Sequence, residues 1–390
     1  MSPAPRERVR RAWSAVAAVT VLNLPLGSIY AFSVFLKPIE HDLGITRSAL
    51  SFVFGLAAVG FTVGLNLAPL AFGKAATWML LAVSMAAAVV GIGLAASANG
   101  LAELLIGYSV LFGVGGGAAY LVLQQGANLL VTRRKGLLNG YIVGLYPAGA
   151  MIAAPLFGWA NAAFGFRVTM AGLAVALLLA GLAATGLAVH AGIELPRRVT
   201  SRTAASGTRR IDVFLRLAVV FFLAAAAGLT VLSQAAGIIA AYGGDTATAL
   251  ATTTAITGAI ACARLMGGWL VDRFAVPFVA AFAHGVAMTG AVLLTVWPEP
   301  MMAALALGMI GTGYGFVSGA TAGGIAVYWP PADYGRIAGR IYVAWCVAAV
   351  TLPVLAGYLF DITRSYGAAV IIAGCGNLLG LAIALGLPRR

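Results

Sequence analysis

Long, nearly unbroken apolar stretches alternate along this chain with short polar segments. A helix needs about 20 apolar residues to cross the hydrocarbon core of a bilayer, and the stretches reach that length. Continuous apolar runs favour helices over the short alternating strands of a membrane β-barrel. The pattern predicts twelve membrane-spanning helices, at residues 11–36, 47–72, 76–97, 101–131, 136–163, 167–189, 213–240, 247–271, 276–296, 300–327, 334–359 and 366–386.

One long polar segment, ELPRRVTSRTAASGTRRID, divides the predicted helices into two sets of six. We therefore expect an N-terminal bundle at 1–189, a basic linker at 190–212 and a C-terminal bundle at 213–390. The run GVGGG matches GTGYG 198 positions later, and Pro155 matches Pro353 at the same offset. Chance matching in a glycine-rich chain is the alternative, but the proline pair and the central linker argue for a repeat. The predicted fold is an all-α membrane protein with two pseudo-symmetric six-helix bundles, an architecture typical of transporters.

Composition agrees with a membrane location: 62% of the residues are hydrophobic and 9% are charged, against about 25% charged in soluble domains. The net charge of +13 would suggest nucleic-acid binding, but its distribution argues against it. With the N-terminus inside, nineteen of the 24 Lys and Arg residues fall on the cytoplasmic side and four on the other. This is the positive-inside pattern, so we expect a multi-pass protein of a bacterial-type inner membrane with both termini cytoplasmic.

Polar and aromatic side chains recur at helical spacing inside several of the predicted spans. A single stripe of this kind is equally well explained by hydrogen bonds between helices or by an aromatic belt at the membrane surface. Several aromatic residues lie too deep for a belt, and the convergence of the stripes indicates a wet central cavity. The candidate lining residues are Tyr30, Tyr120, Gln124, Asn128, Tyr146, Tyr314, Tyr342 and Trp345.

Arg264 lies in the middle of the eighth span, about 12 Å of helix from Asp272 at its polar end. A cation at this depth usually marks a substrate or ion path. Its side chain is too short to reach the interface easily, and no span contains an Asp or Glu in its interior. We therefore expect Arg264 to bind an anionic substrate, because a guanidinium can bind a carboxylate through two parallel hydrogen bonds. Asp272, Arg273 and Arg340 lie at cytoplasmic ends of spans, where loop, gating or headgroup contacts are the alternatives.

The sequence gives little indication that the protein is an enzyme. HExxH, a P-loop, a dinucleotide fingerprint and a Ser-His-Asp set are all missing from the sequence. Cys262, Cys346 and Cys375 have no metal-ligand spacing and are expected to pack as small hydrophobic side chains. We expect a protein that is not an enzyme and that has neither a cofactor nor a metal.

Together these features resemble the major facilitator superfamily. GGWLVDRF after the eighth span is similar to its G-x-x-x-D-R loop signature, whereas the equivalent loop NLAPLAFGKAATW keeps only Lys74. GSIYAFSVFLKPIEHDLGITRSALSF, ARLMGGWLVDRF and PLFGWANAAFGFR resemble oxalate/formate antiporters and related monocarboxylate transporters.

The resemblance implies that Arg264 binds the substrate carboxylate and that Tyr30, Tyr120, Tyr146, Tyr314, Tyr342 and Trp345 line the cavity. Two positions depart from the family pattern: Trp345 replaces a lysine of oxalate carriers, and Ile260 replaces an aspartate of animal proton-coupled carriers. The cargo it implies is a small monocarboxylate such as lactate, pyruvate or formate, carried by a monomer with alternating access. Uniport, anion exchange and H⁺ symport stay open. The alternatives are an exporter of drugs or other amphiphiles, in which Arg264 is structural, and a membrane sensor or receptor without flux.

Overall fold

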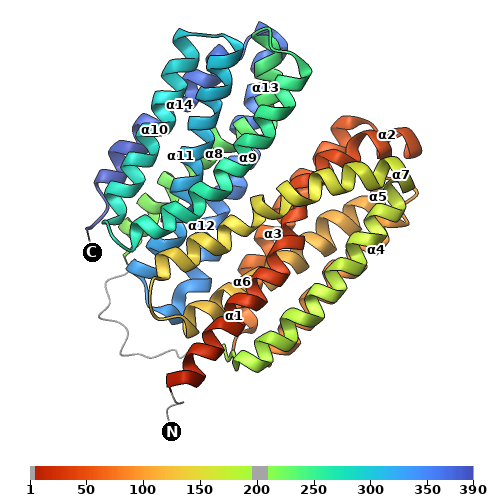
Figure 1. Ribbon diagram of the computed structural model, residues 1–390, viewed down its shortest axis with the longest axis vertical. Helices are drawn as coiled ribbons and strands as arrows, with labels where there is room; N and C mark the ends of the chain where they lie inside the picture. The colour runs from red at the N-terminus through yellow and green to blue at the C-terminus, as the bar shows by residue number, and fades with distance from the viewer. Residues whose placement is uncertain (1–4, 196–209, 390) are drawn as a thin grey trace. The chain divides into compact units, whose positions relative to one another are not determined.

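The computed structural model describes residues 5–195 and 210–389, and these residues are overwhelmingly helical (Figure 1). The helices are α1 (Pro5–Leu26), α2 (Leu36–Leu43), α3 (Arg47–Ala71), α4 (Thr77–Ala96), α5 (Leu101–Leu104), α6 (Gly113–Leu130), α7 (Lys135–Ala191), α8 (Ile211–Ala241), α9 (Thr246–Val271), α10 (Val276–Val296), α11 (Pro300–Tyr328), α12 (Tyr334–Ala349), α13 (Leu352–Thr363) and α14 (Gly367–Leu385). Three other helical segments are η1 (Gly27–Phe35), η2 (Leu105–Phe112) and η4 (Pro331–Asp333). Among the described residues, 11 helical segments are long and apolar enough to cross a membrane.

Helix α7 accounts for two of the predicted spans. Its 57 residues would extend about 85 Å at 1.5 Å per residue, far more than the ~30 Å hydrocarbon core. Gly165 interrupts it with φ 78° and ψ 168°, a backbone conformation that is open to glycine and strained for residues with a Cβ atom. With α7 counted as two parts, the observed segments agree with the twelve predicted spans.

Two of the spans change their helical form near a proline. The first continues past Pro25 as the 3₁₀ segment η1, which begins at Gly27. The eleventh is broken, because α12 ends at Ala349 and α13 begins at Leu352 with Pro353 in its first turn. Proline lacks a backbone N–H and is tolerated best at the start of a helix, which favours a new helix at this point. Apolar patterning predicted both spans but neither change within them.

The chain forms two compact units. Unit 1 comprises Met1–Arg133, Leu145–Thr200 and Pro330–Arg340, and unit 2 comprises Arg134–Gly144, Ser201–Trp329 and Ile341–Arg390. Each unit therefore includes the first turns of one helix from the other sequence half: those of α12 in unit 1 and those of α7 in unit 2. Most of the linker predicted at 190–212 lies outside the described residues.

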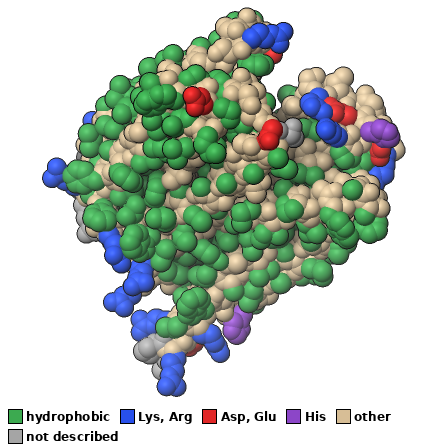
Figure 2. All heavy atoms as spheres, turned by 45° about the horizontal axis from the view of Figure 1, so that its top comes forward, with side chains coloured by type: hydrophobic (Ala, Val, Ile, Leu, Met, Phe, Trp, Pro, Cys, Tyr) green, Lys and Arg blue, Asp and Glu red, His purple; other side chains and the backbone are tan. Residues whose placement is uncertain are grey.

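Close helix packing builds each unit. In unit 1, α3 packs on α6, and α4 packs on α6 and η2; in unit 2, α11 packs on α9 and α10, and α10 packs on α14. Glycine and alanine let these backbones approach closely, as is usual between membrane helices. Large apolar side chains such as Leu156, Leu182 and Phe282 are instead exposed. On the face shown in Figure 2, hydrophobic side chains are spread over the whole surface, and the Lys and Arg side chains lie mainly near its margins.

Candidate functional site

Arg264 lies on α9, which extends without a break from its N-terminal cap to the polar end at Val271. The cap is Asp245, whose carboxylate accepts a hydrogen bond from the Thr248 backbone N–H at 2.7 Å. The hydrogen bonds from Thr248 lower the pKa of Asp245, so this cap is ionised at neutral pH. The Arg264 side chain is 4% exposed.

Two neutral oxygen atoms accept hydrogen bonds from the Arg264 guanidinium. Nη1 donates to the carbonyl of Val143 at 2.9 Å, and Nη2 donates to the hydroxyl of Tyr314 at 2.8 Å. The guanidinium also lies 5.1 Å from the centroid of the Tyr314 ring, within the range of a cation–π interaction. These contacts orient the guanidinium without cancelling its charge.

Tyr314 connects three helices of unit 2. Its hydroxyl accepts a second hydrogen bond from Nε1 of Trp345 at 3.1 Å, so α9, α11 and α12 meet at one oxygen atom. The ring packs directly on Gly228 of α8, where any Cβ atom would collide with it. Tyr314 is 1% exposed and Trp345 is 6% exposed. The Arg264 side chain is thus held by a tyrosine that is itself buried and hydrogen-bonded to Trp345.

Two further residues of this region lie apart from that hydrogen-bonded group. Tyr342 packs edge-on against Phe221 of α8, with ring centroids 5.6 Å apart. Ile260, one turn before Arg264, is fully buried and packs against Gly311 and Gly315 of α11. Ile260, at the position where the resemblance to animal proton-coupled carriers implies an aspartate, is therefore part of an apolar helix contact.

Unit 1 contains an aromatic cluster formed by Tyr30, Phe61, Tyr120 and Tyr146. The Tyr146 ring contacts all three others, with centroid separations of 6.2 Å to Tyr30, 5.5 Å to Phe61 and 5.2 Å to Tyr120. Gly27 makes this possible, because a Cβ atom there would collide with the backbone of Tyr146. The four rings offer weakly polar faces and edges but no formal charge.

The polar residues of α6 face the start of α12 within unit 1. Gln124 donates to the Tyr334 hydroxyl at 3.0 Å, and Asn128 donates to the carbonyl of Gln124 at 2.9 Å. Gln125 accepts from the backbone N–H of Gly335 at 2.6 Å and donates to the carbonyl of Pro331 at 2.8 Å. The amide of Gln125 thereby caps the N-terminus of α12.

The three predicted gating residues have different surroundings. Asp272 accepts hydrogen bonds from the backbone N–H groups of Gly136 and Leu137, both at 2.8 Å, and so caps the N-terminus of α7 within unit 2. Arg273 is exposed, with its guanidinium 4.1 Å from the centroid of the Trp269 ring. The Arg340 side chain is also exposed. Asp272 is thus the only one of the three that the described hydrogen bonds tie to another helix.

The predicted residues therefore form a group around Arg264 in unit 2 and an aromatic cluster in unit 1. Several participants were not predicted, among them Phe61, Gln125 and the carbonyl of Val143. Gln125 could have been found as a second buried amide beside Gln124, whereas Phe61 lies in an apolar run and Val143 contributes only backbone. Over 5–195 and 210–389, no group of three or more His, Cys, Asp and Glu side chains is close enough to hold a metal ion.

Comparison with known proteins is consistent with this arrangement. Residues 20–353 match the model of the Major Facilitator Superfamily. The chain is 27% identical over 308 residues to the uncharacterized MFS-type transporter YhjX of Escherichia coli (strain K12), covering 76% of this chain and 75% of the other. It is 26% identical over 315 residues to monocarboxylate transporter 13 of Rattus norvegicus, covering 77% and 71%.

Its fold is similar to that of the proton:xylose symporter XylE bound to 6-bromo-6-deoxy-D-glucose. That structure gives a TM-score of 0.75 at 15% identity and covers 97% of this chain and 96% of the other. Sequence family, fold and helical content agree, and they confirm the predicted superfamily and its resemblance to monocarboxylate transporters. The chain belongs to the Major Facilitator Superfamily and is a multi-pass membrane transporter.

Proposed function

We propose that this transporter carries a small monocarboxylate and that Arg264 binds its carboxylate group. The observation that carries the proposal is a buried cation oriented by the neutral oxygens of Val143 and Tyr314. A guanidinium in a low-dielectric interior attracts an anion far more strongly than one in water. The similarity to a protein named a monocarboxylate transporter supports the same substrate class.

The residue at position 345 favours a substrate with one carboxylate over a substrate with two. At the position where the resemblance implies a second cation in oxalate carriers, this chain has Trp345, whose indole N–H donates to Tyr314. A dianion would bring a second buried charge that the neutral side chains of Trp345 and Tyr314 do not compensate, and an uncompensated buried charge is strongly unfavourable. The remaining cavity residues we propose are Tyr30, Tyr120, Gln124, Asn128, Tyr146 and Tyr342, which would surround the uncharged part of the acid.

Alternating access would proceed by rocking of two six-helix bundles, with the halves at 1–189 and 213–390. We propose that Asp272 contributes to gating because it holds the first turn of α7. Arg273 and Arg340 would act from exposed positions at the ends of their helices. The distribution of basic residues supports an inner-membrane protein with cytoplasmic termini. We expect a functional monomer.

A thermal-shift assay on purified protein would test the substrate class. Lactate, pyruvate and formate should raise the melting temperature, whereas lactamide should not, because it keeps the shape of lactate without the charge. Arg264→Gln should remove the response to the acids. Stabilisation of wild type and Arg264→Gln alike by an uncharged amphiphile would instead support a drug exporter.

Flux measurements in proteoliposomes would then separate the modes of coupling. Uptake driven by an imposed pH gradient indicates H⁺ symport, and uptake that requires internal acid indicates exchange. Binding of the acid without any flux in these vesicles would contradict the proposal and favour a sensor.

A further inference from the structure

The Val143 carbonyl that accepts a hydrogen bond from Arg264 lies inside α7, where a carbonyl normally has a backbone partner. In an α-helix the carbonyl of residue i accepts a hydrogen bond from the N–H of residue i+4. Four residues after Val143 stands Pro147, and proline has no backbone N–H. The helix continues through this point. The Val143 carbonyl therefore lacks its α-helical donor although the helix persists.

A buried carbonyl without its helical donor requires another one. Val143 is 2% exposed, and buried carbonyl groups are almost always hydrogen-bonded. Nη1 of Arg264 supplies the donor at 2.9 Å. Close packing of α7 on α9 makes this contact possible, because a Cβ atom at Gly140 would collide with the carbonyl of Arg264 and one at Gly144 would lie 3.8 Å from the Arg264 Cβ atom.

The other prolines inside helices do not have such a partner nearby. Besides Pro147, three prolines stand beyond the first turn of a described helix: Pro25 in α1, Pro69 in α3 and Pro155 in α7. The carbonyls four residues before them belong to Val21, Leu65 and Met151. Among the described residues, no side chain donates a hydrogen bond to any of these three carbonyls. The Val143 carbonyl is thus distinguished by receiving one, and the donor is the buried cation.

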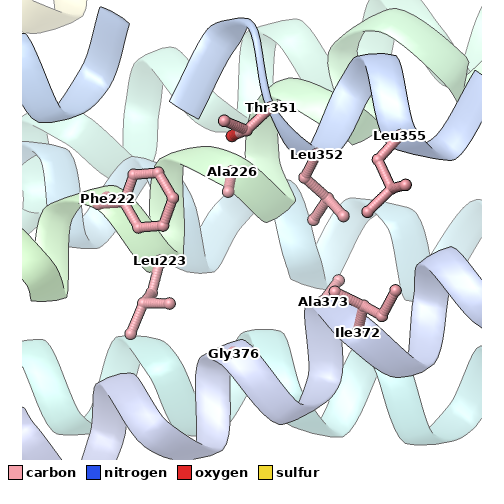
Figure 3. A pocket seen from close by; sticks show the side chains of 9 residues that line it. All are labelled: Phe222, Leu223, Ala226, Thr351, Leu352, Leu355, Ile372, Ala373 and Gly376. Atoms are coloured by element: carbon pink, nitrogen blue, oxygen red, sulfur yellow. The ribbon is translucent and has the colours of Figure 1, made fainter. Parts of the chain in front are cut away.

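Pro353 shows a different consequence of proline in a membrane helix. There the helix breaks between α12 and α13, and Thr351 and Leu352 at the break line an apolar hollow of about 380 Å³ in unit 2 (Figure 3). The carbonyl of Ala348, in the last turn of α12, accepts a hydrogen bond from the nearby Thr351 hydroxyl at 3.2 Å. At Pro147 the helix stays whole, and a residue of another helix provides the donor.

The internal repeat has the proline and the arginine together in one half. The close backbone approach of α7 to α9 recurs between α12 and α3 at an offset of 199 residues. At this offset Pro147 corresponds to Cys346, which has a backbone N–H, and Arg264 corresponds to Leu65. One half therefore has both the missing N–H and the cation, and the other half has neither.

We propose that Pro147 is a positioning residue for Arg264. Because it offers no N–H group, it leaves the Val143 carbonyl as an acceptor, and this acceptor fixes Nη1 and with it the orientation of the guanidinium. A side chain that is already held in one orientation loses less conformational freedom when it binds a carboxylate, which strengthens binding. The effect on acid affinity rests on the proposed role of Arg264, whereas the pairing with Val143 does not.

Melting temperatures of the full-length protein in detergent test the pairing without the acid. Arg264→Leu removes the donor from a buried carbonyl, so we expect a lower melting temperature. Adding Pro147→Ala to that variant supplies the missing N–H and should restore part of the loss. In the wild-type background Pro147→Ala should raise the melting temperature less, because Arg264 already donates to the carbonyl.

Pro155→Ala is the matched control, because it removes a proline from the same helix and its effect should not depend on residue 264. It measures what the loss of a helix proline contributes by itself. Equal effects of Pro147→Ala in the wild-type and Arg264→Leu backgrounds would overturn the proposal.

Titration of lactate followed by tryptophan fluorescence gives a second readout. Pro147→Ala should bind lactate about three- to tenfold more weakly, the range for one hydrogen bond, and Pro155→Ala less than about twofold more weakly. Wild-type affinity in Pro147→Ala, with binding lost in Arg264→Gln, would overturn the positioning role and leave the proposed function standing. Wild-type affinity in Arg264→Gln would contradict the proposed function, and the melting temperatures would still decide whether Pro147 positions Arg264.

Discussion

The N-termini of α7 and α12 are held in equivalent ways by different chemistry. Gly136 of α7 and Gly335 of α12 stand 199 positions apart in the two sequence halves. The backbone N–H of Gly136 donates to the carboxylate of Asp272, and that of Gly335 donates to the amide of Gln125. One cap carries a charge from the loop after α9, and the other is neutral and comes from α6.

The backbone groups that face each capping side chain explain why one cap is a carboxylate and the other is an amide. Asp272 meets two N–H groups, those of Gly136 and Leu137, and a carboxylate offers two acceptor oxygens. Gln125 meets one N–H group and the carbonyl of Pro331, and an amide offers one acceptor and one donor. Asp272 has no counterpart in unit 1, since the residue 199 positions before it is Gly73.

A second pair of equivalent positions, one in each unit, also has a charged residue in unit 2 and a neutral residue in unit 1. A Cβ atom at Gly140 would meet the backbone carbonyl of Arg264, and one at Gly339 would meet that of Leu65. Both pairs are 199 positions apart, so Leu65 occupies in unit 1 the place of Arg264 in unit 2. The repeat preserves the approach of the backbones, while the charged side chain at this pair of positions is present in unit 2 alone. A pseudo-symmetric fold can thus place a buried cation in one unit and an apolar residue at the equivalent position of the other.

Replacing Arg264 with its unit 1 counterpart should have the largest effect. If Arg264 binds the carboxylate as we propose, Arg264→Leu removes two charge-assisted hydrogen bonds to the acid, and we expect at least a ~100-fold loss of affinity. Uptake of radiolabelled lactate into proteoliposomes measures it, with Arg264→Lys as the variant that keeps the charge but loses the planar fork. Wild-type uptake by Arg264→Leu would refute the role of this residue.

Converting the neutral cap into a charged one should destabilise unit 1. In Gln125→Glu the ionised carboxylate faces the Pro331 carbonyl without a donor, and we expect a loss of about 2–3 kcal/mol at pH 8. Burial raises the pKa of the introduced carboxyl, so lowering the pH protonates it and restores a donor. Melting temperatures in detergent should therefore recover between pH 8 and pH 5, while wild type serves as the control for general pH effects. A pH-independent loss would contradict this explanation.

The reciprocal change at the charged cap should be milder. Asp272→Asn keeps one acceptor but turns its NH₂ group toward a second N–H, and it removes a negative charge from a helix N-terminus. We expect a loss of about 1–2 kcal/mol, seen as a lower melting temperature. Asp272→Glu, which retains the charge, is the matched control. Identical melting of Asp272→Asn and wild type would show that this cap contributes little.

The smallest expected effect on acid affinity comes from removing one tyrosine hydroxyl, either at Tyr314 in unit 2 or at Tyr146 in the aromatic cluster of unit 1. Tyr314→Phe removes the oxygen shared by Arg264 and Trp345, so we expect roughly a three- to tenfold weaker acid affinity. Tyr146→Phe keeps the ring that contacts the aromatic cluster and should change affinity less than about threefold. Titration of lactate followed by tryptophan fluorescence measures both. A larger effect at Tyr146 would place acid recognition in unit 1.

Several features of this protein could be read from sequence because they are local. The apolar stretches predicted the spans, and the gap between the fifth (136–163) and the sixth (167–189) contains Gly165, where α7 is interrupted. Arg264 was conspicuous because a cation inside an apolar run needs no tertiary information to be noticed. Family membership likewise followed from short motifs and the six-plus-six repeat.

Tertiary structure alone decided what surrounds those residues. The carbonyl of Val143 carries no side-chain signal, and Phe61 resembles any other apolar residue until its ring meets Tyr146. Tyr314 could be proposed as a cavity residue, but its bridging position depends on the space left by Gly228. Sequence determined which residues are unusual for a membrane helix; the packing of distant helices decided their partners, because hydrogen bonds and ring contacts depend on distances that no linear pattern contains.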